Sequence, residues 1–170
     1  MLTITPEIEE AADRLEKAAS AASEYHFMSR RVLPSYFEPE GFERIGRGSH
    51  RVAFRGPGGL VYKVELRLGA NLTEAETFSW ARTRAHLPAE VRLADQALVG
   101  MISVMEYVDG VTFADVIDSG EGWAGWEVED LKDLNNTLDA YSGLDDLHAG
   151  NLMIDNTGTV VVVDLSSGTS

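Results

Sequence analysis

The chain has 170 residues, which fits one domain or two small lobes that share a cleft, and 44% of them are hydrophobic, enough for a packed core. Its net charge of −14 argues against a nucleic-acid-binding protein and against docking on anionic membranes, since both need a basic face. The absence of cysteine excludes disulfides, thiolate metal sites and cysteine nucleophiles. The sequence shows neither a bilayer-length apolar run nor a signal-peptide pattern, so we expect a soluble cytoplasmic protein.

The first predicted element is a helix. Thr5 offers a capping hydroxyl and Pro6 is preset for the first helical turn. Apolar residues then recur at helical spacing, which predicts a helix running to about Phe27 or Arg30. Pro34 and Pro39 mark the linker that follows.

From Phe42 onward the pattern changes to short apolar strands separated by glycine turns, then to helices. On the first of these later helices, Leu72, Ala75 and Phe78 are expected to share the packed face. The predicted strands are 42–45, 52–54, 60–66, one or two strands over 97–107, and a hairpin of 152–154 with 160–163. The predicted helices are 71–85, 114–117 and 126–141.

Three side chains with oxygen acceptors gather late in the chain. Asp164 ends a run of valines that reads as a buried strand, where a carboxylate is costly unless it is paired or metal-bound. The Asn151 amide and the Asp164 carboxylate supply the hard oxygen ligands that Mg²⁺ takes. Asp146, close to Asn151 in the sequence, could accept a proton from an attacking hydroxyl.

A second group lies earlier in the chain. Gly46 and Gly48 form a turn whose backbone N–H groups could approach phosphate oxygens. Lys63 lies among apolar strand residues and would need an anionic partner if it faced inward. We expect Glu76 to be that partner, because it precedes Trp80 by one helical turn, with Glu74 as the alternative.

These motifs resemble the protein kinase-like superfamily over roughly residues 42–168. The segment Asp-Leu-His-Ala-Gly-Asn, from Asp146 to Asn151, is similar to the catalytic loop of the aminoglycoside-phosphotransferase branch. Asp164 stands where the metal-binding Asp of the Asp-Phe-Gly motif stands in protein kinases, and 105–108 looks like the hinge that holds adenine. The order of motifs along the chain matches that of the superfamily.

The resemblance implies an α+β, bilobal protein-kinase-like fold that binds ATP and Mg²⁺. It would comprise an N-terminal helix and linker (1–39), an antiparallel-sheet N-lobe with one αC-type helix (40–108) and a much reduced helical C-lobe (109–170). The implied catalytic residues are Asp146, Lys63 and Glu76, and the implied metal ligands are Asn151 and Asp164. The implied cofactor-binding residues are Gly46, Gly48, Ser49, Ala53, Val61, Lys63, Met105, Glu106, Val108 and Met153.

The sequence also departs from the superfamily pattern. Arg51 replaces the third glycine of the phosphate loop, so either the loop is stiffer or Arg51 itself meets phosphate. The chain ends shortly after Asp164, without the segments that bind peptide substrates in protein kinases. We expect a phosphotransferase acting on a hydroxyl, with a protein Ser/Thr, including the chain itself, slightly preferred over a small-molecule alcohol. The alternative is a pseudokinase that binds a partner protein, and a homodimer is left open.

Overall fold

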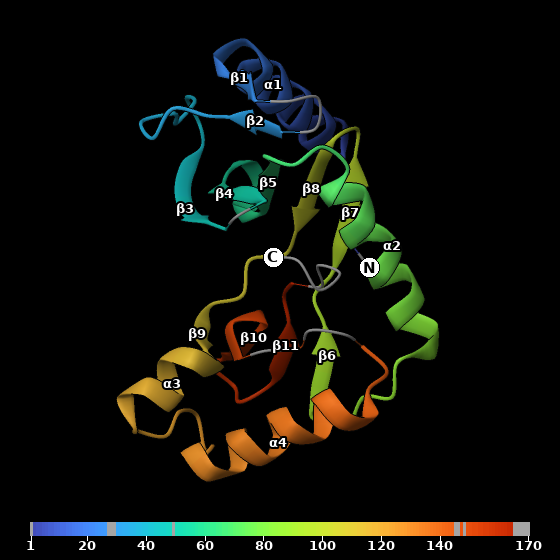
Figure 1. Ribbon diagram of the computed structural model, residues 1–170, viewed down its shortest axis with the longest axis vertical. Coiled ribbons are helices and arrows are strands. Elements are labelled where there is room, and N and C mark those ends of the chain that lie inside the picture. Colours follow the sequence, from blue (N-terminus) through green and yellow to red (C-terminus); the bar gives the residue numbers. More distant parts are fainter. Residues whose placement is uncertain (1, 27–29, 49, 145–146, 148, 165–170) are drawn as a thin grey trace. The chain divides into compact units, whose positions relative to one another are not determined.

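The structure is a computed structural model that describes residues 2–26, 30–48, 50–144, 147 and 149–164 (Figure 1). Its contacts divide the chain into two compact units. Unit 1 comprises Met1–Ala75 and Asp95–Tyr107, and unit 2 comprises Glu76–Ala94 and Val108–Thr169. Each unit has its own sheet, and we describe them in turn.

Unit 1 is built on a five-stranded antiparallel sheet, with a short 3-10 turn, η1 (Pro57–Gly59), between two of its strands. In spatial order the strands are β3 (Glu43–Arg47), β4 (Arg51–Arg55), β5 (Val61–Glu65), β8 (Ile102–Met105) and β7 (Gln96–Val99). The three strands expected between residues 42 and 66 are confirmed. The apolar stretch over 97–107 is a strand pair rather than one long strand, because Gly100 adopts a positive φ of 60° at the turn.

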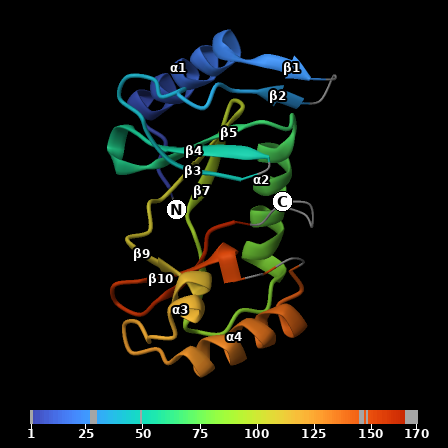
Figure 2. The ribbon, with the colours of Figure 1, turned by 60° about the vertical axis from the view of Figure 1, so that its left-hand side comes forward.

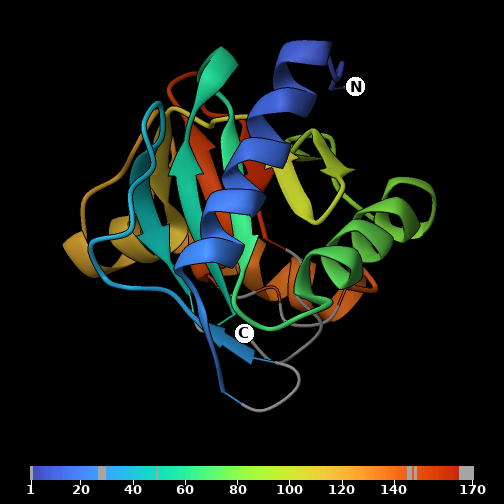
Figure 3. The same ribbon diagram turned by 90° about the horizontal axis from the view of Figure 1, so that it is seen from above.

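Helix α1 (Pro6–Ala22) covers one face of this sheet (Figure 3). Its start is capped as expected, since the Thr5 hydroxyl accepts a hydrogen bond from the Ile8 N–H at 3.3 Å. Leu15 is fully buried, and burial of a leucine side chain contributes about 2 kcal/mol. The sheet residues that line this apolar core are Val52, Phe54, Tyr62, Val64, Ile102 and Val104.

The prediction that the first helix reaches residue 27 or 30 is wrong. The helix ends at Ala22 and is followed by β1 (Glu24–His26), which pairs antiparallel with β2 (Arg30–Val32). The Arg31 side chain fixes β2, because its two Nη groups bond to the Glu16 carboxylate at 2.8 and 2.9 Å and its Nε bonds to the Glu65 carbonyl at 2.7 Å. Such long-range bonds override a local helical pattern.

Helix α2 (Ala70–Arg84) agrees with the predicted helix over 71–85. Its buried residues are Asn71, Glu74, Phe78 and Ala81, a stripe at helical spacing. Leu72, which was expected on the packed face, is 52% exposed. Phe78 is buried as predicted, but the rest of the face was placed incorrectly, because Asn71 and Glu74 are polar and apolar periodicity does not reveal them.

Unit 2 contains a four-stranded sheet with two helices beside it (Figure 2). The strand order is β6 (Val91–Leu93), β11 (Val160–Val162), β10 (Leu152–Asp155) and β9 (Gly110–Thr112). The predicted hairpin is confirmed as β10 and β11. The sequence did not predict β9 or β6, and β6 pairs parallel with the distant β11. The helices are α3 (Phe113–Ser119) and α4 (Val128–Tyr141), and a short 3-10 turn, η2 (Ala149–Asn151), precedes β10.

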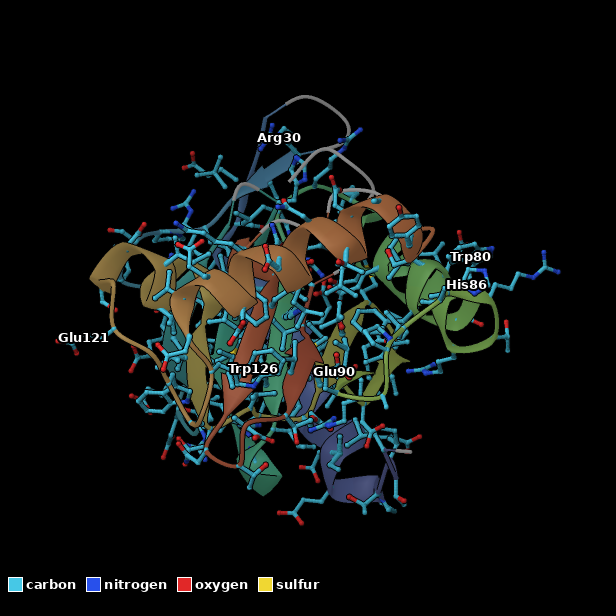
Figure 4. All side chains as sticks on the ribbon, turned by 90° about the horizontal axis from the view of Figure 1, so that it is seen from below. Arg30, Trp80, His86, Glu90, Glu121 and Trp126 are labelled. Atoms are coloured by element: carbon cyan, nitrogen blue, oxygen red, sulfur yellow. The ribbon has the colours of Figure 1, made fainter. Side chains whose placement is uncertain are left out.

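Two tryptophans hold the turn between β10 and β11. The Trp126 Nε1–H donates to the Gly158 carbonyl at 2.7 Å, and Figure 4 shows this side chain beside the hairpin. The Trp123 Nε1–H donates to the Asp155 carbonyl at 3.4 Å. Inside the turn, the Asp155 carboxylate accepts the backbone N–H groups of Thr157 and Thr159 at 2.9 and 3.0 Å. The turn is therefore fixed by its own side chains and by the segment before α4.

No helix in the described ranges is long and apolar enough to cross a membrane.

Candidate functional site

The strand register of unit 1 brings five of the predicted cofactor residues onto one face of the sheet. Lys63 on β5 lies directly across from Ala53 on β4 and from Ser103 on β8. Residues paired across strands point to the same face, as do residues two apart along a strand. The five are Gly46, Ala53, Val61, Lys63 and Met105. We call this side the Lys63 face; α1 covers the opposite side.

A buried ion pair dominates the Lys63 face. The Lys63 Nζ donates to Glu74 Oε2 at 3.1 Å, and the Ser103 hydroxyl donates to Glu74 Oε1 at 2.8 Å. The Lys63 side chain is 11% exposed and that of Glu74 is 0% exposed. The preferred prediction, Glu76, is therefore wrong as the partner of Lys63: Glu76 is exposed, whereas Glu74 was the alternative. Glu74 lies on the same stripe of α2 as Phe78, and that stripe faces inward.

The surroundings of Glu74 keep it ionised. Burial alone would raise the pKa of this carboxyl, but the Lys63 and Arg51 charges, with hydrogen bonds from Arg51 and Ser103, lower the pKa from 4.5 to about 2. At neutral pH Glu74 is thus a carboxylate that pairs with Lys63. Ser103 is itself held by the Gln96 amide, which donates to its hydroxyl at 3.2 Å.

Arg51 is the second cation on Glu74. Its Nη1 forms an ion pair with Glu74 Oε2, the same oxygen that Lys63 contacts. From the sequence, Arg51 in place of the third glycine could either stiffen the phosphate loop or contact phosphate itself. In the structure the Arg51 side chain is buried against Glu74. Arginine here adds positive charge to the Lys63 face without giving up the lysine–glutamate pair.

Asn71 positions the start of α2 and was missed by sequence reasoning. Its Nδ2 donates to the Lys63 carbonyl and to the Met101 carbonyl, both at 2.8 Å. Its backbone N–H donates to Glu65 Oε2 at 3.1 Å. These bonds tie the first turn of α2 to β5, which places Glu74, three residues later, against Lys63. An isolated Asn near a helix start carries no sequence signal for this role.

The glycine turn between β3 and β4 is closed by one backbone bond, from the Gly48 N–H to the Arg51 carbonyl at 2.8 Å. Gly46 and Gly48 are exposed. A Cβ at Gly46 would meet no atom within 4 Å, and Gly46 does not have a positive φ. Neither packing nor backbone strain therefore requires glycine at residue 46. Ser49, the third predicted residue of this turn, lies outside the described residues.

The predicted hinge begins where β8 ends. The Glu106 N–H donates to the Asp95 carbonyl at 2.9 Å, and Glu106 Oε2 accepts the Asp95 N–H at 3.2 Å. The backbone N–H of Glu106, one of the groups predicted to serve the hinge, is therefore bonded to Asp95 in the structure. Val108 is buried and belongs to unit 2.

Unit 2 holds the predicted metal ligands. The Val163 N–H donates to the Asn151 carbonyl at 3.0 Å, so Asp164 directly follows a residue that is bonded to Asn151. The Asn151 residue is 4% exposed and Asp164 is half-buried. Met153 lies on β10 across from Val161. Asp146, the predicted base, lies outside the described residues, and within the described ranges no three His, Cys, Asp or Glu side chains gather as a metal site.

Comparison with known proteins gives structural similarity alone: no family model and no curated protein matches the sequence. Rv3197 of Mycobacterium tuberculosis, solved in complex with erythromycin, is similar at a TM-score of 0.50 and 14% identity, over 91% of this chain and 51% of that chain. The chain has a protein kinase-like fold. Two weaker similarities are the apo form of PpkA-294 (TM-score 0.45, 14% identity) and the streptomycin–ATP ternary complex of APH(2″)-IIa (TM-score 0.35, 15% identity). They cover 79% and 69% of this chain, and 61% and 34% of those chains.

The kinase-like fold confirms the fold class expected from the sequence. Unit 1 supplies the antiparallel sheet and the start of the αC-type helix α2, and unit 2 supplies the small helical part. The chain spans about half the length of Rv3197. In the structure Lys63 pairs with Glu74, the alternative partner, and not with the preferred Glu76.

Proposed function

We propose that the chain binds ATP with Mg²⁺ and transfers the γ-phosphate to a hydroxyl acceptor. The observation that carries the proposal is the buried Lys63–Glu74 ion pair on a sheet face that also presents Ala53 and Val61. A protein Ser or Thr, including one on the chain itself, is slightly preferred over a small-molecule alcohol as the acceptor.

The energetics of the ion pair support a functional reason for it. A buried lysine–glutamate pair often stabilises a fold no better than two packed apolar residues would. Here the pair is retained together with Arg51, Ser103 and Gln96. The Glu74 side chain is fully buried and that of Lys63 keeps 11% exposure, so an anionic ligand would approach the pair from the Lys63 side. Phosphate oxygens are suitable acceptors for its N–H groups.

The residues present fit ATP and Mg²⁺. Ala53 is small and partly exposed, and Val61 and Met105 are buried apolar residues of the same face, an environment that suits a purine ring. Asn151 and Asp164 offer the amide and carboxylate oxygens that Mg²⁺ prefers. When bound, the metal neutralises charge that develops on the transferring phosphate.

In the proposed reaction the acceptor hydroxyl oxygen bonds to the γ-phosphorus as the bond to the β–γ bridging oxygen breaks. ADP leaves with that oxygen, and the hydroxyl proton passes to a carboxylate, the role that the sequence resemblance gives to Asp146. Lys63 holds the phosphates of the nucleotide, and Glu74 keeps its ammonium in place. The work of the protein is therefore positioning and charge neutralisation.

The test uses the purified chain with radiolabelled ATP and Mg²⁺, with and without generic protein acceptors. We expect label transfer that Lys63→Met and Asp164→Asn each reduce about 100-fold or more, the scale for loss of one electrostatic contact in catalysis. Lys132→Met is the matched control, because Lys132 is an exposed lysine of α4 paired only loosely with Glu129 at 3.5 Å. Equal loss in the control, or no transfer by the wild-type chain, would contradict the proposal.

One observation favours the second candidate, a binding module without catalysis. Between Asp109 and Asp139 the chain carries many acidic residues, and Lys132 is the one basic residue among them. Such a surface suits a basic partner protein. Thermal stabilisation by ATP and Mg²⁺ without label transfer would support this candidate, and no response to nucleotide would exclude both.

A further inference from the structure

The segment that joins β2 to β3 contains a turn over Pro34, Ser35, Tyr36 and Phe37 (Figure 1). The Phe37 N–H donates to the Pro34 carbonyl at 3.0 Å and closes the turn. Phe37 is buried, and its ring packs edge-on against that of Phe54, with 5.8 Å between the centroids. Ser35 and Tyr36 are exposed, Tyr36 to 85%. The turn therefore presents two hydroxyl groups to solvent on an anchored backbone.

The Ser35 hydroxyl has no hydrogen-bond partner within the described part of the chain. Other exposed hydroxyls bond to the backbone: that of Thr137 donates to the Asp133 carbonyl at 2.9 Å, and that of Ser119 donates to the Val116 carbonyl at 3.0 Å. An exposed hydroxyl without an internal partner can enter the site of another molecule without breaking a bond.

An arginine is already held beside this serine. Arg44 on β3 donates through its Nη1 to the Ser35 carbonyl at 2.9 Å and to the Pro34 carbonyl at 3.4 Å. Among the described residues no carboxylate forms an ion pair with Arg44. The other N–H groups of its guanidinium are therefore available to an anion at Ser35. A phosphate on the Ser35 hydroxyl would supply that anion.

The turn lies on the side of the unit 1 sheet that α1 covers. Arg44 is paired with Phe54, which belongs to the apolar core beneath α1. Lys63 lies on the opposite face, because it follows Tyr62, the strand partner of Phe54. A hydroxyl held in this turn therefore does not meet phosphates bound by Lys63 of the same chain, and transfer to Ser35 requires a second copy.

We propose that Ser35 is phosphorylated by a second copy of this chain and that Arg44 binds the resulting phosphate. This modification rests on the proposed function and gives that function a protein acceptor. The Ser35 oxygen bonds to the γ-phosphorus while the bond to the β–γ bridging oxygen breaks, that oxygen leaves on ADP, and the hydroxyl proton passes to a carboxylate of the catalysing copy. The product carries nearly two negative charges at pH 7, and arginine binds phosphate oxygens through paired N–H groups.

Peptide mass spectrometry of the purified chain, after incubation with ATP and Mg²⁺, locates the phosphate, which we expect on Ser35. Ser35→Ala should lose most of the self-incorporated label yet still phosphorylate a generic protein acceptor. Ser79→Ala, at an exposed serine of α2, is the matched control and should keep both activities. An isotope-labelled Lys63→Met chain, which is impaired in transfer, should receive phosphate on Ser35 when it is mixed with the wild-type chain.

The outcomes separate this modification from the proposed function. Transfer to the generic acceptor without phosphate on Ser35 would overturn the modification and leave the proposed function intact. Absence of phosphate on the Lys63→Met chain in the mixture would overturn transfer between copies. Absence of transfer to any acceptor would overturn both the modification and the proposed function.

A chain with phosphoserine encoded at residue 35 tests the role of Arg44 without any catalysis. By phosphorus-31 NMR, the pKa of this phosphate should rise in Arg44→Gln, because a nearby cation favours the dianion. Arg47→Gln makes the same charge change at an exposed arginine of the same strand and should leave the pKa nearly unchanged. The exposed glutamates between residues 38 and 43 are common to these chains, so their effects cancel. Equal shifts in the two variants, or no shift in Arg44→Gln, would overturn the role given to Arg44.

Discussion

Replacing Glu74 by Gln should destabilise the chain in a strongly pH-dependent way. The variant keeps the shape of the side chain but leaves Lys63 and Arg51 without their shared carboxylate. The folded pKa of Glu74 is about 2, against an ordinary value of 4.5. At about 1.4 kcal/mol for each pKa unit, this difference corresponds to about 3 kcal/mol of stability at pH 7.

The sign of the pH dependence follows from the lowered pKa. Glu74 contributes its full stabilisation above pH 4.5, where the unfolded carboxyl is also ionised, and the contribution is lost as pH falls toward 2. The free energies of unfolding of the wild-type chain and of the Glu74→Gln variant should therefore differ by about 3 kcal/mol at pH 7 and by about 1 kcal/mol at pH 3. Other acidic groups titrate in both proteins, so they cancel in the difference.

Urea unfolding followed by far-UV circular dichroism measures these free energies without adding salt that would screen the charges. Glu76→Gln is the control, because Glu76 is an exposed neighbour on the same helix, and its effect should stay within about 0.5 kcal/mol at every pH. A loss at pH 7 no larger than that of the control, or a loss that is the same at pH 7 and pH 3, would refute the role given to the Glu74 carboxylate.

Two further predictions concern glycine and tryptophan. Gly110→Ala should destabilise unit 2 by several kcal/mol or unfold it, because a Cβ there would clash with the Ile154 carbonyl oxygen. Gly46→Ala, where a Cβ would meet no atom within 4 Å, should leave the urea midpoint nearly unchanged. A similar midpoint shift for both variants would contradict this. Trp126→Phe keeps the aromatic ring but removes the N–H bonded to the Gly158 carbonyl at 2.7 Å, and should lower the free energy of unfolding by about 1 kcal/mol. An unchanged midpoint for this variant would show that the bond does not hold the turn.

The sequence predicts the elements whose pattern is local. The start of α1 follows from Thr5 and Pro6, and the hairpin of β10 and β11 follows from two apolar runs around a turn that contains Gly158. Elements that depend on distant partners were missed. The strand β6 has three residues and exists because it pairs with β11, far along the chain. The end of α1 was placed too late because β1 is defined by its pairing with β2.

The candidate site was predicted in part, for a related reason. Strand register gathers Ala53, Val61 and Lys63 as expected, since their strands were located correctly. The choice of Glu76 over Glu74 failed because it relied on Trp80 packing the helix, whereas Trp80 is exposed and the buried stripe of α2 contains Glu74. Ser103 and Asn71 act through hydrogen bonds that only the folded register creates.

The two faces of the unit 1 sheet differ in the residues that they bury: one is apolar and the other contains a charged pair. One face packs Phe54, Tyr62 and Val64 against α1, and buried side chains of this size each contribute about 2 kcal/mol. The other face buries Lys63 and Glu74, a pair that contributes little net stability but is costly to break. The apolar face supports the fold, so the charged pair on the other face need not contribute to its stability. Because such a buried pair adds little net stability, its presence on the Lys63 face supports the proposed nucleotide site.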